Sequence, residues 1–141
     1  MSLSILLVDD ESKMRLLLSD ILKMEGYVVS EAADGATGLQ QFNTVQPDLV
    51  LLDITMPNGD GLGVLKAIRQ QNSVVGVLMV SGLQQNQTVK EAMASGADGY
   101  LPKPFRLQDL YQEIQRVSKM VYSRRYAITH HASWQSRRLF Y

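Results

Sequence analysis

Acidic, hydroxyl and ammonium side chains follow several short apolar segments of the sequence. Two adjacent acids follow the first segment, one acid follows the third, a serine ends the fourth, and a lysine stands between two prolines after the fifth. In chain order these residues are Asp9, Asp10, Asp53, Ser81 and Lys103. Three carboxylates at one place require a cation, because two unit charges about 4 Å apart interact by about 4 kcal/mol at an effective dielectric of about 20. An all-oxygen site favours Mg²⁺ or Mn²⁺ over zinc and copper.

A carboxylate beside such a cation is well placed to attack phosphorus. Mg²⁺ usually keeps coordination positions for phosphate oxygens. The ammonium of Lys103 can reach another phosphate oxygen, and the hydroxyl of Ser81 can donate a hydrogen bond to a third. Phosphoryl transfer depends mainly on positioning and charge neutralisation. The pattern therefore predicts that Asp53 is a nucleophile that forms an aspartyl phosphate.

These side chains can meet only if the apolar segments form neighbouring strands. Residues 5–8, 49–52 and 74–80, and more weakly 27–29 and 100–101, have the length and composition typical of strands buried on both faces. Between and after them, apolar residues recur at intervals near 3.6, which predicts five helices. Five strand–helix alternations predict an α/β fold with a doubly wound, five-stranded parallel sheet. Ligands of such sheets bind at the carboxyl ends of the strands.

Length and composition fit one soluble domain. The chain has 141 residues, of which 45% are hydrophobic and 20% charged, as is usual for a globular protein with its own core. It has no cysteine, which excludes disulfides and thiolate metal sites. The first apolar segment is far shorter than the ~20 residues needed to cross a bilayer. We therefore expect a cytoplasmic protein with no membrane segment.

The net charge of zero hides an asymmetry between the two parts of the chain. All 14 acids lie at or before Glu113, so residues 1–116, with nine basic side chains, carry −5, and residues 117–141 carry +5. Apolar residues lose their helical period after about residue 122. We therefore predict a domain at 1–120, followed by a basic, aromatic C-terminal tail or truncated linker at 121–141.

Several interpretations of residues 121–141 stay open at this stage. The segment could be mobile or ordered by a partner, could bind nucleic acid or an acidic protein surface, could lead to an output domain, or could extend the last helix for self-association. Its adjacent residues His130 and His131 lack a third ligand and are weak evidence for a metal site.

The residues that carry the predicted chemistry lie in motifs that resemble the receiver domain of two-component response regulators. The motifs occur in the family's order and spacing over about residues 4–120. They are Val8-Asp9-Asp10 with Met14-Arg15, Leu52-Asp53-Ile54-Thr55-Met56-Pro57, Asp60-Gly61, Val80-Ser81-Gly82 and Ala97-Asp98-Gly99-Tyr100-Leu101-Pro102-Lys103-Pro104-Phe105. The resemblance implies a flavodoxin-like, CheY-like fold with strand order 2-1-3-4-5. It also implies a signalling phosphoacceptor with slow autodephosphorylation rather than an enzyme.

The resemblance implies a role for each residue of the site. Asp9 and Asp10 would hold Mg²⁺ beside Asp53, with the backbone carbonyl of Thr55 as a further ligand. Asp53 would accept a phosphoryl group from a sensor histidine kinase or phosphotransfer protein. Lys103 would contact that group.

The resemblance also implies a switch. Ser81 would move toward the phosphoryl group, and Tyr100 would turn inward into the released space. This movement would alter the face formed by the helix around 89–93, the strand at 100–101 and the last helix. A downstream protein or a second copy would bind there, whereas direct nucleic-acid binding is not expected. The peptide bond between Lys103 and Pro104 would be cis.

Three positions depart from the family's pattern. Thr55 lies two residues after the phosphoacceptor and Leu83 two residues after the switch hydroxyl, and neither is suited to activating an attacking water. We therefore expect a phosphorylated form that is not especially short-lived. Gly59 replaces a bulkier apolar residue, which is expected only to loosen its loop.

Two other functions are consistent with parts of the pattern. An aspartate-nucleophile phosphohydrolase would use the same acid, but such enzymes usually have a second acid where this chain has Thr55, together with a cap insertion. A pseudo-receiver would be an interaction module that never takes phosphate, and the complete set of acids, Ser81 and Lys103 argues against it.

Overall fold

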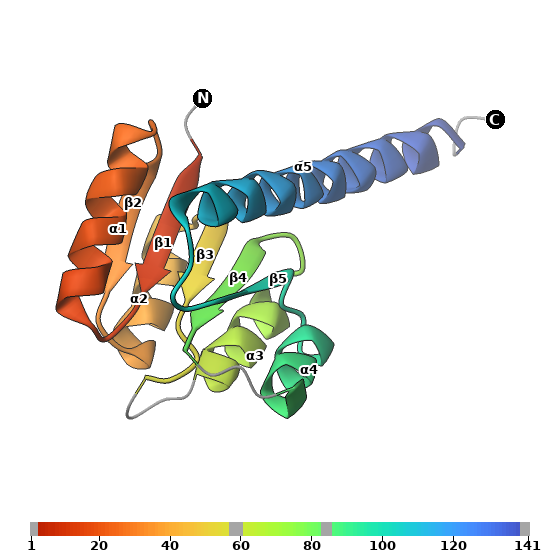
Figure 1. Cartoon of the computed structure of the whole chain (residues 1–141). Helices are drawn as coiled ribbons and strands as arrows, with labels where there is room; N and C mark the ends of the chain where they lie inside the picture. The colour runs from red at the N-terminus through yellow and green to blue at the C-terminus, as the bar shows by residue number, and fades with distance from the viewer. Residues whose placement is uncertain (1–2, 57–60, 83–85, 139–141) are drawn as a thin grey trace.

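The protein is built on five parallel strands with helices on both sides (Figure 1). The computed structural model describes residues 3–56, 61–82 and 86–138, and within these ranges all side chains except those of residues 86 and 131–138. The strands are β1 (Ser4–Val8), β2 (Val28–Ala32), β3 (Leu49–Leu52), β4 (Gly76–Ser81) and β5 (Gly99–Pro102). The helices are α1 (Ser12–Met24), α2 (Gly35–Val45), α3 (Gly61–Gln71), α4 (Asn86–Ala94) and α5 (Leu107–Arg138).

The strand order is β2-β1-β3-β4-β5, and each neighbouring pair is parallel. The predicted fold class and strand order are therefore confirmed. In this order the strands β1 and β3 are neighbours, although α1, β2 and α2 separate them in sequence. The topology thus brings the residues after β1 and β3 to the same edge of the sheet.

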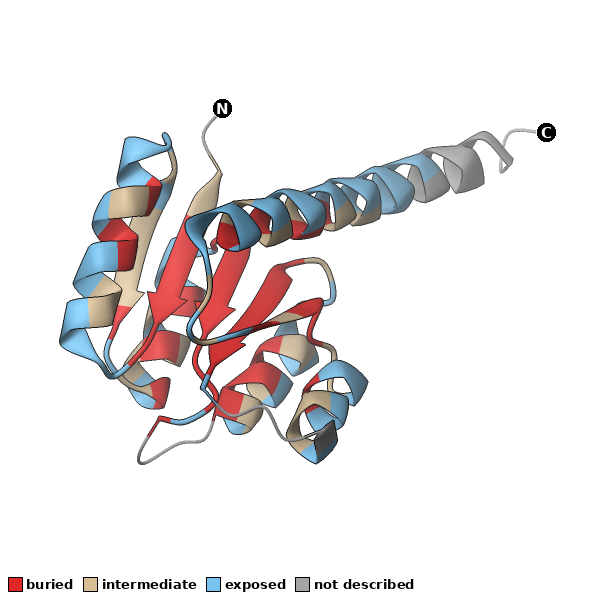
Figure 2. Ribbon diagram, viewed as in Figure 1, coloured by how far each residue is buried: buried red, intermediate tan, exposed pale blue. Residues whose placement is uncertain are grey.

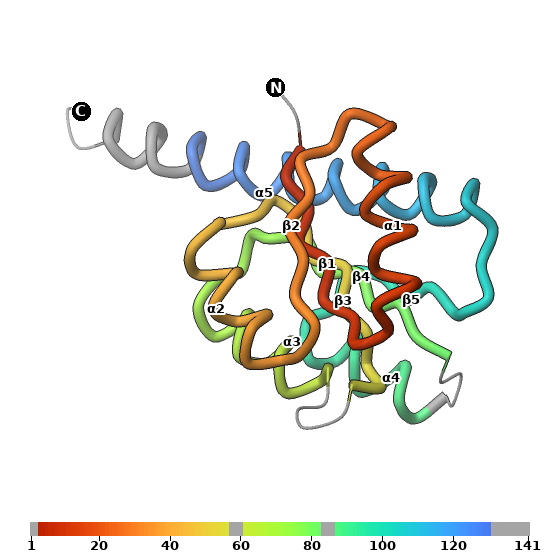
Figure 3. Tube along the Cα trace, turned by 90° about the vertical axis from the view of Figure 1, so that its left-hand side faces the viewer, coloured from red at the N-terminus to blue at the C-terminus, as the bar shows by residue number. Residues whose placement is uncertain are grey.

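The central strands β1, β3 and β4 are almost entirely apolar because both of their faces are covered, whereas the edge strand β2 includes Ser30 and Glu31 and is only partly buried. Successive residues of β4 alternate between two core clusters: Val77 and Met79 pack on one face, and Leu78 and Val80 pack on the other. Helices α2, α3 and α4 cover the first face, and α1 and α5 cover the second. Figure 3 shows α1 and α2 on opposite sides of β1 and β2, and Figure 2 shows the buried sheet between helices with exposed outer surfaces.

Helix α5 is longer than the sequence pattern predicts. It continues to Arg138 and projects beyond the sheet (Figure 1), whereas the apolar period fades after about residue 122. Polar contacts replace the apolar stripe here: Arg124 pairs with Asp98, and Arg125 pairs with Asp48. The backbone of residues 121–138 thus continues the helix, which corrects the expectation that the pattern ends at 122. A separate role for 121–141 as tail or linker stays a prediction.

No helix in the described ranges is both long and apolar enough to span a membrane.

Candidate functional site

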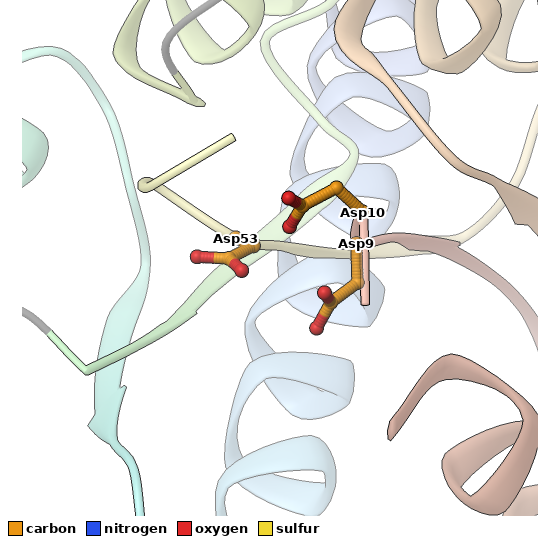
Figure 4. Close-up of side chains that lie close together, drawn as sticks. All are labelled: Asp9, Asp10 and Asp53. Carbon is orange, nitrogen blue, oxygen red and sulfur yellow. The ribbon is translucent and has the colours of Figure 1, made fainter. Parts of the chain in front are cut away.

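The three predicted acids meet at the carboxyl ends of β1 and β3 (Figure 4). The N–H of Asp9 donates to the carbonyl of Ala32 at 3.1 Å, and the N–H of Asp53 donates to the carbonyl of Val8 at 3.0 Å, so both acids continue the strand ladder. Carboxylate oxygens of Asp9, Asp10 and Asp53 all lie within 4.8 Å of one another. Asp9 and Asp53 are buried, and Asp10 is exposed. The group is therefore anchored in the core and open on the Asp10 side.

Lys103 reaches this acidic group from the segment after β5. Its Nζ lies 2.9 Å from Oδ2 of Asp9 and 3.5 Å from Oδ2 of Asp53. Its N–H donates to the carbonyl of Ser81 at 2.9 Å, which fixes the lysine backbone to the end of β4. The peptide bond between Lys103 and Pro104 is cis, as predicted. The structure thus brings together the acids and the ammonium that are distant in sequence.

The charge state of Lys103 follows from its surroundings. Partial burial alone would lower the pKa of its ammonium, but the hydrogen bond to Asp9 and the negative charges of Asp53 and Asp9 outweigh burial and raise the pKa. Lys103 is therefore protonated at neutral pH. It places a positive charge 3.5 Å from Oδ2 of Asp53.

Thr55 orients the carboxylate of Asp53. Its N–H and its hydroxyl both donate to Oδ1 of Asp53, at 3.0 Å and 2.7 Å. These two bonds hold Oδ1, while Oδ2 faces Lys103. The hydroxyl contact was not part of the sequence-based prediction, although an aspartate side chain that accepts from the backbone N–H two residues later is a common turn arrangement. The predicted metal contact through the carbonyl of Thr55 stays a prediction.

Gly61 allows α3 to begin directly against this turn. A Cβ at this position would lie 2.6 Å from Cα of Ile54 and still closer to the carbonyl oxygen of Asp53. No other residue type has room here, because the atoms in contact are backbone atoms that cannot move aside. The glycine therefore lets α3 begin directly against the backbone of Asp53 and Ile54 without displacing it.

The two predicted switch residues lie on the neighbouring strands. Ser81 ends β4 and is fully buried, and its strand pairs with β3 such that Leu52 lies opposite Met79. Tyr100 lies in β5 and is half-buried against the core cluster that includes α3 and α4. Both residues are thus near the edge that carries the acids, and their movement stays a prediction. Leu83 and Gly59, to which the sequence assigned effects, lie outside the described residues.

The donor set fits a hard divalent cation. The three carboxylates are all-oxygen donors, they lie close together, and one of them is exposed to solvent. Such a set matches Mg²⁺, which takes a few carboxylates and keeps its other positions for water or phosphate. It does not match zinc or copper, which favour nitrogen and sulfur ligands.

A second polar contact in the site, besides that of the Thr55 hydroxyl, had no role in the sequence-based prediction. Arg15 donates from Nη1 to the carbonyl oxygen of Asp9 at 2.7 Å. The sequence signal was an arginine near the start of the helix that follows the paired acids, but its partner is a backbone atom, which no pattern of residue types reveals.

Comparisons with known proteins agree with this geometry. Residues 5–115 match the response regulator receiver domain. The chain is 38% identical over 113 residues to the chemotaxis protein CheY of Bacillus subtilis, which covers 79% of this chain and 94% of that protein. It is 35% identical over 117 residues to CheY of Halobacterium salinarum, covering 83% and 98%.

A solved structure shows the same arrangement of the chain. The CheY-like receiver domain protein of Methanospirillum hungatei superposes with a TM-score of 0.85 at 27% identity, covering 88% of this chain and 99% of that one. The matched residues contain the complete acidic group and Lys103. This chain belongs to the response regulator receiver domain family.

Proposed function

We propose that this protein is a Mg²⁺-dependent phosphoacceptor that takes a phosphoryl group onto Asp53 and thereby changes a protein-binding face. The observation that carries the proposal is the meeting of Asp53 with two further acids and with Lys103, from segments that are far apart in sequence. The donor would be a phosphohistidine of a sensor histidine kinase or phosphotransfer protein, acting in the cytoplasm.

The transfer step follows from the positions of the carboxylate and ammonium. Oδ2 of Asp53 attacks phosphorus, because Oδ1 is held by the two hydrogen bonds from Thr55. The bond between phosphorus and the donor's imidazole nitrogen breaks, its electron pair stays on that nitrogen, and the leaving imidazole takes a proton. Lys103, 3.5 Å from Oδ2, donates to an oxygen of the arriving phosphoryl group.

Asp9, Asp10 and Asp53 would hold the cation. Bound Mg²⁺ would neutralise the acids and the phosphoryl oxygens, which otherwise repel one another. In the present arrangement Lys103 already satisfies Asp9 at 2.9 Å. Because an ammonium has three N–H donors, Lys103 can donate to the phosphoryl oxygen either in place of this contact or in addition to it.

The output would leave through Ser81 and Tyr100. Ser81 ends β4 beside β3, and its backbone carbonyl already accepts from the N–H of Lys103. Movement of its hydroxyl toward the phosphoryl group would change the packing at β5, where Tyr100 lies beside α3 and α4. A downstream protein or a second copy would bind the face formed by α4, β5 and α5.

The experiment that tests this function is incubation with Mg²⁺ and a small acyl phosphate, followed by intact mass measurement of wild type and Asp53→Asn. We expect the wild type to gain one phosphoryl group and the variant to gain none, because a side-chain carboxamide is a far weaker nucleophile than a carboxylate. Asn keeps the size of the side chain, so a loss of uptake reports chemistry rather than packing.

The same sample separates the two rival functions. Steady release of phosphate from small phosphate esters would indicate a phosphohydrolase. An unmodified wild type under conditions where the protein is folded would indicate a pseudo-receiver and would contradict the proposed function.

The lifetime of the phosphorylated form is a further prediction. The hydroxyl of Thr55 is engaged with Oδ1 of Asp53 at 2.7 Å, so it is a poor candidate to orient a water toward phosphorus. We expect slow decay in the presence of Mg²⁺, measured as loss of the phosphorylated mass after removal of the donor. A half-life of only a few seconds would contradict this expectation.

A further inference from the structure

Arg15 links three elements around the acidic group. Its side chain leaves the first turn of α1, and Nη1 donates to the carbonyl oxygen of Asp9 at 2.7 Å. Its Nε lies 3.3 Å from the carboxylate of Glu31 in β2, and its own N–H donates to the carbonyl of Glu11 at 3.0 Å. The arginine side chain is largely buried, with 18% of its surface exposed. It is thus held from two sides while it holds the end of β1.

The carbonyl that Arg15 binds belongs to the peptide between Asp9 and Asp10. The other polar atoms of Asp9 also have partners: its N–H donates to Ala32, and Oδ1 accepts from the N–H of Glu11 at 2.9 Å. Asp10 differs, because its side chain is exposed and, in the described part of the chain, receives no hydrogen bond. With no side-chain partner among the described residues, the Asp10 carboxylate is held in place mainly through its own backbone, of which the preceding peptide is a part.

We infer that Arg15 is a positioning residue for the cation site: by fixing the Asp9–Asp10 peptide it presets the Asp10 carboxylate toward Asp53. The inference rests on the proposed function, since it concerns the same Mg²⁺ site. It assigns to Arg15 no contact with the cation or the phosphoryl group. Groups that orient metal ligands typically change metal affinity by about 10- to 100-fold when they are removed.

The positive charge of Arg15 and its positioning of Asp10 have opposite effects on the affinity for Mg²⁺. A guanidinium beside the site repels a divalent cation, although its pairing with Glu31 offsets part of that repulsion. If Arg15 acted through charge alone, its removal would tighten Mg²⁺ binding. If it acts by fixing the peptide, its removal weakens binding. The sign of the change thus separates the two effects.

The test is a calorimetric Mg²⁺ titration, at fixed ionic strength, of the wild type, Arg15→Ala and Arg15→Lys. Lys13→Ala is the matched control, because Lys13 is an exposed cation on the same turn of α1. We expect roughly a tenfold or greater rise in Kd for Arg15→Ala, a smaller rise for Arg15→Lys, and no rise for Lys13→Ala. The amide resonance of Asp10 in the metal-free protein should also shift in Arg15→Ala and not in Lys13→Ala.

Thermal unfolding in a chelator controls for a purely structural role. The titrations are made well below each midpoint, and Arg15→Met, which keeps the apolar stem, replaces Arg15→Ala if that variant does not fold. An unchanged or lower Kd in the Arg15 variant would overturn the inference while the wild type still binds Mg²⁺ and takes phosphate. A wild type that does neither would instead overturn the proposed function.

Discussion

Replacing Asp98 by alanine is expected to lower the free energy of unfolding by about 3–5 kcal/mol, the usual cost of removing one partner of a buried ion pair. Asp98 is 6% exposed and precedes β5. Its Oδ2 accepts from the N–H of Val77 at 3.0 Å, from Arg69 at 2.9 Å and from Arg124 at 3.1 Å, and Oδ1 also accepts from Arg124. Its removal leaves two guanidinium groups and one buried N–H without this acceptor.

The matched control for Asp98→Ala is Arg125→Ala. Arg125 is the neighbour of Arg124 on α5, but its side chain is 53% exposed where it pairs with Asp48. Exposed pairs contribute at most about 1 kcal/mol, so this variant should differ from the wild type by no more than that. Denaturant unfolding at neutral pH measures both losses. Equal losses in the two variants would show that the buried carboxylate has no special role in holding α5 to the sheet.

Replacing Lys103 by alanine should have opposite effects on phosphorylation and on Mg²⁺ binding. Removing a charged donor from the reacting oxygens typically slows a reaction by about 10²- to 10³-fold, and we expect a loss of this size in the rate of uptake from a small acyl phosphate. Mg²⁺ should bind more tightly, because Nζ no longer competes for Oδ2 of Asp9 at 2.9 Å. Intact mass against time measures the first effect and calorimetry the second.

Lys66→Ala is the control for Lys103→Ala, because it removes a cation from an exposed position on α3. It should leave the rate of uptake unchanged. Weaker Mg²⁺ binding in Lys103→Ala would indicate that the lysine maintains the acidic group instead of competing for it. An unchanged rate of uptake would remove Lys103 from the transfer step.

The fold and the main site could be predicted because their signals are local. Segments such as Leu49–Leu52 are apolar at every position, which is typical of a strand covered on both faces. Because all five strands are parallel, the residues after them share one edge, so Asp53 after β3 and Lys103 after β5 are expected on the same side of the sheet, and the structure brings their side chains into contact. The chemistry proposed for that edge was inferred from residue type, and it stays a prediction.

The remaining features depend on contacts that residue types do not encode. Arg15 binds the backbone carbonyl of Asp9. Every residue type has a backbone carbonyl, so the sequence does not indicate which one the arginine contacts. Arg124 and Asp98 are 26 residues apart and belong to no common period, so their pairing shows only when α5 is laid against the sheet. The sequence did not predict the continuation of α5 for the same reason. Beyond residue 122 the helix contacts the rest of the domain through ion pairs and not through an apolar stripe.

The most direct test of the proposed phosphoacceptor site is to locate the phosphoryl group on the wild-type chain. The protein is incubated with a small acyl phosphate in Mg²⁺ and, in parallel, in excess chelator, and phosphorylated peptides are mapped by mass spectrometry. The predicted result is a single acyl phosphate on Asp53 that forms only with Mg²⁺. Phosphate on another residue, or equal uptake in the chelator, would contradict the assignment of Asp53 and its acidic neighbours.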